Sequence, residues 1–165
     1  MTMRDKAEYI MHESIQRVMP GPAVATALQN CNFTEGRLYL VAVGKAAWEM
    51  ANSAVQCLTK KVCAGIVLTK YGHVQGPIKD VACYEAGHPV PDENSLRGTQ
   101  AILQMVTGLE EQDTVLFLLS GGGSSLFEQP FIPLEELREI TAQLLACGAS
   151  ITEINTIRKH LSQVK

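Results

Sequence analysis

The chain has 165 residues, of which 46% are hydrophobic and 19% are charged, and its formal net charge is -3. This length suits one domain with a substantial hydrophobic core, and the apolar content excludes a disordered chain. No block of basic residues is present, so we expect no nucleic-acid partner. No apolar run approaches the length of a membrane span, so we expect no membrane partner either.

The cysteines and the N-terminus bear on the compartment. The five cysteines are scattered, odd in number and without a C-x-x-C pair. That pattern favours reduced thiols over a zinc site or a disulfide framework. Residues 1–6 lack the apolar run of a signal peptide. We therefore expect a soluble protein of the cytoplasm.

Hydrophobic spacing predicts helices and strands that alternate along the chain. The strongest helical pattern starts at Ala47, and Pro20 and Pro22 are expected to end the first helix. The predicted helices are residues 5–19, 23–29, 47–58, 93–106, 134–146 and 151–164. Short apolar runs predict strands at residues 38–43, 64–68, 81–84 and 114–119.

This alternation predicts an α/β fold, a Rossmann-like three-layer sandwich with a mostly parallel sheet and helices on both faces. Asp92 is expected to cap the helix after it, Gly148 to end a helix, and the pair Ser150 and Glu153 to form a capping box. The last predicted helix has no stop signal. We therefore expect a single domain, 1–165, whose fold is incomplete at the C-terminus.

A first candidate site follows the strand at residues 38–43. Gly44, Lys45 and Ala46 stand between this strand and a helix, at the sheet edge where parallel α/β folds bind ligands. A lysine at a helix N-terminus opposes the helix dipole unless an anion lies between its ammonium and the free N–H groups. The alternative is an exposed lysine on a connecting loop.

A second candidate site follows the strand at residues 114–119. Ser120, Gly121, Gly122, Gly123 and Ser124 form a loop whose backbone a ligand can approach closely. Successive N–H groups in such a loop bind phosphate or carboxylate, whereas the alternative is a flexible turn. The sequence matches neither a Walker loop, a nucleophile elbow, nor the G-x-G-x-x-G dinucleotide fingerprint.

A third candidate site lies on the last predicted helix. Asn155, Arg158 and Lys159 are three to four residues apart, so they can share one polar face. A solvated basic face is the alternative. His88, between Gly87 and Pro89, is either a turn histidine or a polar group at the cleft. No His, Asp or Glu cluster has metal-ligand spacing.

Four segments in order carry a family resemblance: residues 41–51 (VAVGKAAWEMA), 87–92 (GHPVPD), 119–125 (LSGGGSS) and 153–162 (EINTIRKHLS). Together they resemble the N-terminal domain of the class II glycerate 2-kinases, the MOFRL-type enzymes. Some members of that family are labelled hydroxypyruvate reductase. The resemblance covers nearly the whole chain.

The resemblance implies ATP-dependent phosphorylation of D-glycerate in a cleft between two domains, of which the C-terminal MOFRL domain is absent here. By resemblance, Lys45 would stabilise the transferring phosphoryl group or orient the glycerate. The loop from Ser120 to Ser124 would hold phosphate or carboxylate, and Asn155, Arg158 and Lys159 would complete the donor set. Mg²⁺ is expected with ATP, although the sequence shows no ligands for it.

Two other functions stay open on the sequence. One is reduction of hydroxypyruvate with NADH or NADPH, which the missing dinucleotide fingerprint disfavours. The other is a non-catalytic anion-binding module. Because an apolar stripe on the last helix and an unpaired sheet edge would be exposed, we also expect the chain alone to self-associate as a homo-oligomer or be marginally stable, and to be inactive.

Overall fold

The computed structural model describes residues 1–33 and 35–165, which form seven helices and four strands. The helices are α1 (Met3–Arg17), α2 (Pro20–Leu28), α3 (Ala47–Cys57), α4 (Glu93–Met105), α5 (Gly123–Leu126), α6 (Leu134–Ala146) and α7 (Ile151–His160). The strands are β1 (Leu38–Val43), β2 (Val62–Lys70), β3 (Val81–Ala86) and β4 (Thr114–Leu119).

The four strands form one sheet in the order β3–β2–β1–β4, and every neighbouring pair is parallel. This confirms the predicted α/β class and the predicted strands. The strands β2 and β3 extend beyond the predicted segments 64–68 and 81–84. Because all four strands run in one direction, their carboxyl ends meet at the same edge of the sheet.

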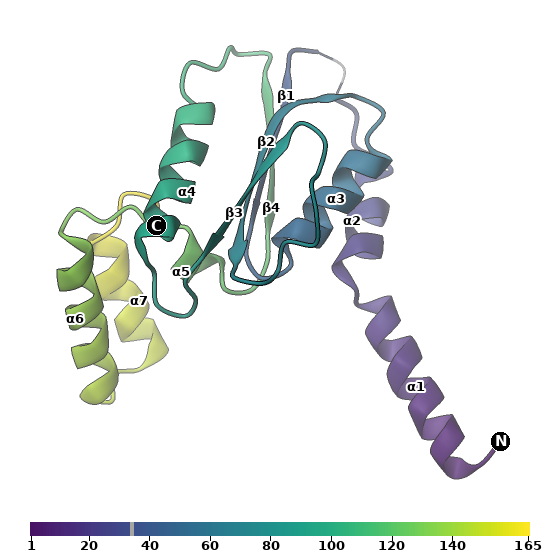
Figure 1. Cartoon of the computed structure of the whole chain (residues 1–165), viewed down its shortest axis with the longest axis horizontal. Coiled ribbons are helices and arrows are strands. Elements are labelled where there is room, and N and C mark those ends of the chain that lie inside the picture. The colour runs from purple at the N-terminus through teal and green to yellow at the C-terminus, as the bar shows by residue number, and fades with distance from the viewer. Residues whose placement is uncertain (34) are drawn as a thin grey trace.

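Helices cover both faces of the sheet, as predicted (Figure 1). The helix α3 packs on β1 and β2 from one face, with α2 beside it, and α4 packs on β2 and β3 from the other. Strand β1 is buried along its whole length. Its unbroken apolar sequence follows from that position, since neighbours enclose it on both edges and both faces.

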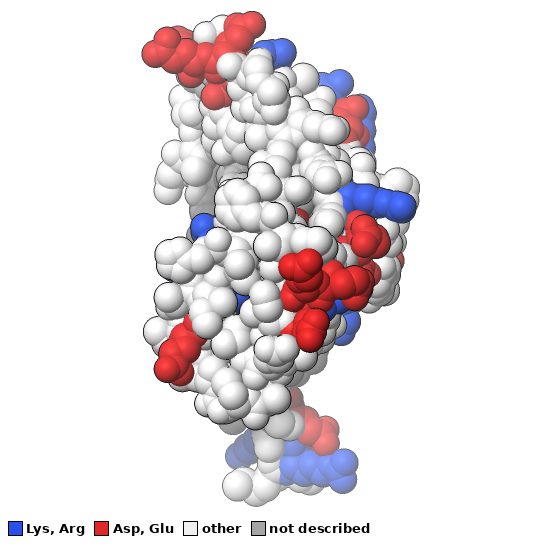
Figure 2. Space-filling model, turned by 90° about the vertical axis from the view of Figure 1, so that its left-hand side faces the viewer, with Lys and Arg blue, Asp and Glu red and all other residues white. Residues whose placement is uncertain are grey.

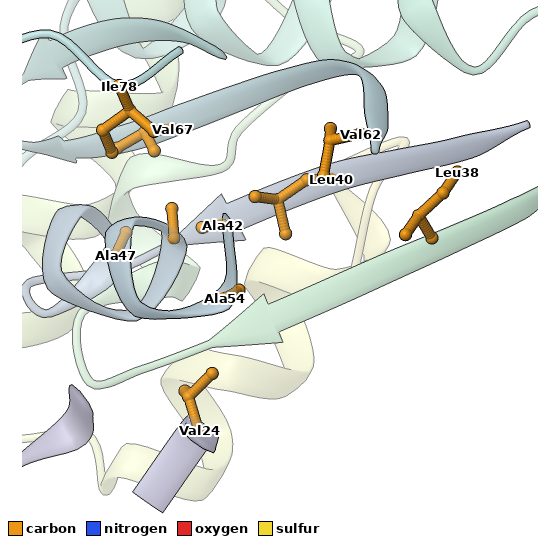
Figure 3. Close-up of a cluster of buried hydrophobic side chains, with 10 residues drawn as sticks. Val24, Leu38, Leu40, Ala42, Ala47, Ala54, Val62, Val67 and Ile78 are labelled. Atoms are coloured by element: carbon orange, nitrogen blue, oxygen red, sulfur yellow. The ribbon is translucent and has the colours of Figure 1, made fainter. Parts of the chain in front are cut away.

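Side chains of β1 alternate between two hydrophobic clusters. On the α3 face, Leu38, Leu40 and Ala42 pack with the small residues that α3 turns inward, as Figure 3 shows. On the α4 face, Val41 and Val43 pack with a cluster that includes Ile102. The inward alanines let α3 lie close to the sheet, which fixes where its N-terminus meets the carboxyl end of β1.

The N-terminal helices differ in their bounds from the predicted segments 5–19 and 23–29. Helix α1 has no buried residue and extends away from the sheet, although its sequence is amphipathic (Figure 1). Pro20 lies in the first turn of α2, where the missing N–H costs nothing, so α2 begins earlier than the predicted segment 23–29. The proline therefore separates two consecutive helices and starts the second.

The C-terminal region departs most from the prediction. Helix α7 ends at His160, so the predicted helix to residue 164 is wrong. The chain turns back beside residues 129–131, where the Phe131 N–H donates to the Leu161 carbonyl and the Gln163 N–H to the Gln129 carbonyl. Of the α7 positions in the predicted apolar stripe, Ile154 is buried, whereas Ile151 and Ile157 are exposed.

The capping residues occupy the predicted places. The Asp92 carboxylate accepts from the Ser95 N–H at the start of α4, and Ser150 and Glu153 form a capping box on α7. Gly148 follows the end of α6 with a positive φ. These short-range signals are confirmed because each depends only on neighbouring backbone groups.

The surface shown in Figure 2 is the left-hand side of Figure 1. It is largely uncharged, with acidic and basic side chains in small separate groups. Among the helices that the structure describes, none has both the length and the apolar character needed to cross a bilayer.

Candidate functional site

Two of the predicted sites meet at the edge where β1 and β4 end. Val43 pairs with Leu119 at the carboxyl ends of these strands, so the turns after them are neighbours. The Lys45 N–H donates to the Gly121 carbonyl at 2.9 Å. The structure therefore brings the lysine turn and the glycine loop together in one place.

Ser120 ties the two turns together. Its N–H donates to the Val43 carbonyl at 2.9 Å, and its Oγ accepts from the Ala46 N–H at 3.1 Å. Gly44 has φ +122°, and a Cβ there would lie 2.2 Å from the Ser120 Oγ. Only glycine fits at position 44, because any side chain would enter the space of the serine.

The predicted anion position at the start of α3 stays a prediction, and three of the N–H groups near it are already bonded. The N–H groups of Lys45, Ala46 and Ala47 donate to Gly121, Ser120 and Gly44, respectively. The N–H groups of Trp48 and Glu49, in the first turn of α3, donate to no acceptor in the described chain and remain available beside Lys45. The Ser120 hydroxyl is also engaged, since it donates to the Val43 carbonyl at 3.3 Å.

Further free donors lie in the glycine loop. Within the described chain, the N–H groups of Gly121, Gly122 and Ser124 donate to no protein acceptor, whereas the Gly123 N–H donates to the Ser120 carbonyl. Gly121 and Ser124 are exposed. Three backbone donors on four consecutive residues form a site that suits a phosphate or carboxylate oxygen.

Packing explains two of the three glycines. Gly122 has φ +89°, and a Cβ there would lie 2.6 Å from the His88 Nε2 and 3.3 Å from the Lys45 Cγ. A Cβ on Gly123 would lie 2.6 Å from the Leu119 Cδ1. Only Gly121 is open, with the Lys45 Cε at 4.0 Å as the nearest neighbour. A ligand can therefore approach the loop most closely at Gly121.

Lys45 is exposed and borders a hollow of about 420 Å³, whose other walls include Trp48, Glu49 and His73. That volume falls in the range of small-molecule sites. His73 supports the turn, because its Nδ1 lies 2.8 Å from the Lys45 carbonyl oxygen. The Glu85 carboxylate accepts from the His73 and Val74 N–H groups, which lowers its pKa.

His88 is half-buried between the glycine loop and Lys45. Burial is the largest cause that lowers the pKa of its imidazole below the ordinary value, and the positive charges of Lys45 and Lys70 lower it further. The ring is therefore neutral at pH 7. The sequence left its role undecided between a turn residue and a cleft residue, and the structure places its ring against the glycine loop.

Arg158 reaches the loop from α7. Its Nη2 donates to the Ser124 carbonyl at 2.9 Å and lies 3.5 Å from the Glu128 Oε2. Glu128 is fully buried and also binds the Lys165 ammonium, whose pKa burial lowers. This arrangement makes Arg158 a brace between α7 and the loop, and its predicted contact with a bound anion stays a prediction.

Asn155 and Lys159 are exposed on α7. Neither side chain forms a hydrogen bond to the rest of the described chain, and their predicted contact with an anion stays a prediction. Glu128 is the residue that the sequence analysis missed. A single acidic residue in the stretch LFEQPF, between an apolar pair and a proline, was the available signal for a buried charge.

The described part of the chain contains no group of three or more His, Cys, Asp or Glu side chains that could hold a metal ion. The chemistry that these residues offer is anion binding through backbone donors, with the Lys45 ammonium and the His88 imidazole beside them.

Comparison with known proteins identifies relatives for nearly the whole chain. A family model described as "Domain of unknown function (DUF4147)" matches residues 6–165. A protein of Thermotoga maritima named D-glycerate 2-kinase is 55% identical over 99% of this chain. An Agrobacterium vitis protein named putative hydroxypyruvate reductase is 43% identical over 79% of it.

The fold is also found in a solved structure. The crystal structure of a glycerate kinase from Thermotoga maritima matches 96% of this chain with a TM-score of 0.89 and 56% identity. This chain covers 38% of that crystallised chain. This chain also spans 39% of the length of the D-glycerate 2-kinase and 30% of the length of the putative hydroxypyruvate reductase.

Proposed function

The chain belongs to the DUF4147 family, and from that membership we propose that it supplies the anion-binding half of an enzyme that phosphorylates D-glycerate with ATP. The names of its relatives support the reaction. One observation in this chain carries the proposal. The hydrogen bond from Lys45 to Gly121 places an ammonium beside three unpaired backbone donors.

Phosphoryl transfer depends on positioning and on charge neutralisation more than on covalent catalysis by the protein. In this proposal the N–H groups of Gly121, Gly122 and Ser124 bind oxygens of the phosphate chain or of the glycerate carboxylate. Lys45 neutralises the charge that accumulates on the transferring group. Its flexible side chain starts at the loop and borders the hollow, so it reaches both substrates.

Hydrogen bonds between protein groups hold the lysine turn and the glycine loop in place. Ser120 fixes the lysine turn, and the brace from Arg158 fixes the start of α5 through the Ser124 carbonyl. Because both contacts use protein groups only, the loop has its binding shape before a ligand arrives. Such preorganised donors lower the cost of binding a charged group.

The described carboxylates of this chain do not fit a magnesium site, since no cluster of them faces the loop. Mg²⁺ accompanies ATP in this proposal, and no step is assigned to it here. We also place the protein in the cytoplasm, which the five free cysteines support.

Hydroxypyruvate reduction is the second candidate, because one relative carries that name. The glycine loop lacks the G-x-G-x-x-G pattern that positions a dinucleotide. Two enzyme assays distinguish these functions. The intact protein that carries this chain is given D-glycerate with ATP in one assay, and hydroxypyruvate with NADH or NADPH in another.

We expect ADP formation that depends on D-glycerate, and no oxidation of the nicotinamide cofactor. Lys45→Ala should remove the glycerate-dependent ADP signal, whereas Lys79→Ala, an exposed lysine on another loop, should keep it. Turnover of hydroxypyruvate without glycerate kinase activity would overturn the proposal.

A further inference from the structure

His88 is held in place by a turn that is fixed on several sides. The turn runs from Gly87 to Asp92, and a Cβ on Gly87 would lie 2.6 Å from the Val90 carbonyl oxygen. The Asp92 carboxylate accepts from the Tyr71 hydroxyl at 2.6 Å. The Arg138 Nε donates to the Pro91 carbonyl at 2.9 Å and ties the turn to α6. The backbone that carries His88 is therefore rigid.

The imidazole of His88 faces the glycine loop with a free nitrogen. Its Nε2 lies 2.6 Å from the ideal Cβ position of Gly122, and the Lys45 Cγ lies 3.3 Å from the same point. In the part of the chain that the structure describes, neither ring nitrogen of His88 bonds to another residue, and a contact with its own backbone raises its pKa slightly against the larger lowering effects. His73 differs, because its Nδ1 already contacts the Lys45 carbonyl oxygen.

The charges around His88 keep its ring neutral. Lys45, Lys70 and His73 all lower its pKa, after burial, which is the largest cause. The two nearby carboxylates are engaged elsewhere. Asp92 accepts from Tyr71 and Ser95, and Glu85 accepts from backbone N–H groups of the loop after β2. A neutral imidazole with a free nitrogen is able to accept a proton at pH 7.

We propose that His88 is the base that takes the proton from the acceptor hydroxyl during phosphoryl transfer at the glycine loop. In this step the hydroxyl oxygen forms a bond to the γ-phosphorus of ATP. The bond from that phosphorus to the β–γ bridging oxygen breaks, and ADP leaves with the electron pair. The hydroxyl proton moves to the Nε2 of His88. The inference rests on the proposed kinase function.

The site separates two tasks between neighbouring side chains. Lys45 carries the positive charge that the phosphoryl group needs, and the same charge disfavours protonation of His88. Position 122 must be glycine for this arrangement, since the imidazole occupies the space of its side chain. The ring is thereby held against the loop that would bind the phosphates.

The test uses His88→Gln in the intact protein, with His12→Gln on the exposed helix α1 as the matched control. We expect kcat of His88→Gln to fall about 100-fold or more, in the range that a positioned general base contributes. The KM values for glycerate and ATP should stay within about 3-fold, because the backbone donors remain. The control should match the wild type.

The pH dependence distinguishes a base from a packing residue. Wild-type kcat/KM should fall on the acidic side with an apparent pKa below the ordinary imidazole value, because protonated His88 cannot accept the proton. That acidic limb should disappear in His88→Gln. A variant that keeps kcat and the limb would overturn the proposal, as would a large rise in KM with kcat unchanged.

A second measurement needs no variant and covers the case in which His88→Gln fails to fold. Titration of the imidazole signals by nuclear magnetic resonance in the wild-type protein should give one histidine whose pKa matches the kinetic limb. A kinetic limb that matches no histidine would overturn the proposal. Absence of any glycerate-dependent ADP formation by the wild type would instead refute the proposed function itself.

Discussion

The turn after β1 and the turn after β4 lie side by side and use their backbone in opposite ways. After β1, the N–H groups of Lys45 and Ala46 are bonded to the neighbouring turn, and only the lysine side chain is free. After β4, the N–H groups of Gly121 and Gly122 have no acceptor in the described chain. One turn presents a side chain, and the other presents backbone.

The difference follows from which turn supplies the acceptors. The Gly121 carbonyl and the Ser120 hydroxyl satisfy the N–H donors of the first turn, so the neighbouring turn holds it in place. The second turn keeps backbone N–H groups that have no protein acceptor, and only a ligand or water can bond to them. The two turns therefore form one site. The turn after β1 is its rigid side, and the glycine loop after β4 is its receptive side.

Removing the side chain from the first turn should have the largest effect. We expect Lys45→Ala in the intact protein to lower kcat for glycerate about 100- to 1,000-fold, as loss of one charge-stabilising donor does. Glycerate KM should change less, because the backbone donors persist. Steady-state kinetics with ATP measures both. A variant with wild-type kcat would show that the ammonium is not part of the site.

The next largest effect is expected from a side chain added at Gly44, on the rigid side of the site. Gly44→Ala should lower the free energy of unfolding by about 3 kcal/mol, since it adds backbone strain at φ +122° and a clash with Ser120. Gly72→Ala is the matched control, with φ +76° but open space, and should cost about 1 kcal/mol. Urea unfolding compares them, and equal losses would contradict the role of the close contact.

A side chain added at Gly122, on the receptive side, should lower the stability somewhat less. Gly122→Ala should destabilise the protein by about 2 kcal/mol, because the new methyl group meets the His88 ring at φ +89°. Part of this loss should return in the double variant with His88→Ala, which removes the obstacle. Urea unfolding of the two single variants and the double variant checks this coupling. Additive losses would mean that the ring does not press on the loop.

The sequence predicted the fold well because its signals are local or strongly patterned. The apolar run at residues 38–43 is a strand enclosed on all sides, and the caps at Asp92 and Ser150 need only neighbouring backbone. The end of α7 was missed, since it depends on pairing of residues 161–163 with a distant segment. Similarly, the exposed face of α1 has the spacing of a buried helix.

For the candidate site, the sequence names residues but does not show how their donors are arranged. That Lys45 and the glycine loop share an edge follows from parallel strands. Which N–H groups are free does not follow, because it depends on Ser120 reaching across to Ala46. Likewise, no spacing rule links Glu128 with Arg158 and Lys165, which meet only through the packing of α7.

Removal of the Ser120 hydroxyl should have the smallest effect on stability, and it tests which of the two turns this hydroxyl serves. If its hydroxyl serves the first turn, Ser120→Ala should lower the free energy of unfolding by about 1 kcal/mol, the cost of leaving the Ala46 N–H without its acceptor. Affinity for ATP should hardly change, because that hydroxyl already donates to the Val43 carbonyl. Ser124→Ala, at an exposed position, should leave stability unchanged. Thermal unfolding and isothermal titration of both variants decide the matter. A Ser120→Ala protein of normal stability that no longer binds ATP would reverse the assignment, and the hydroxyl would then belong to the receptive side.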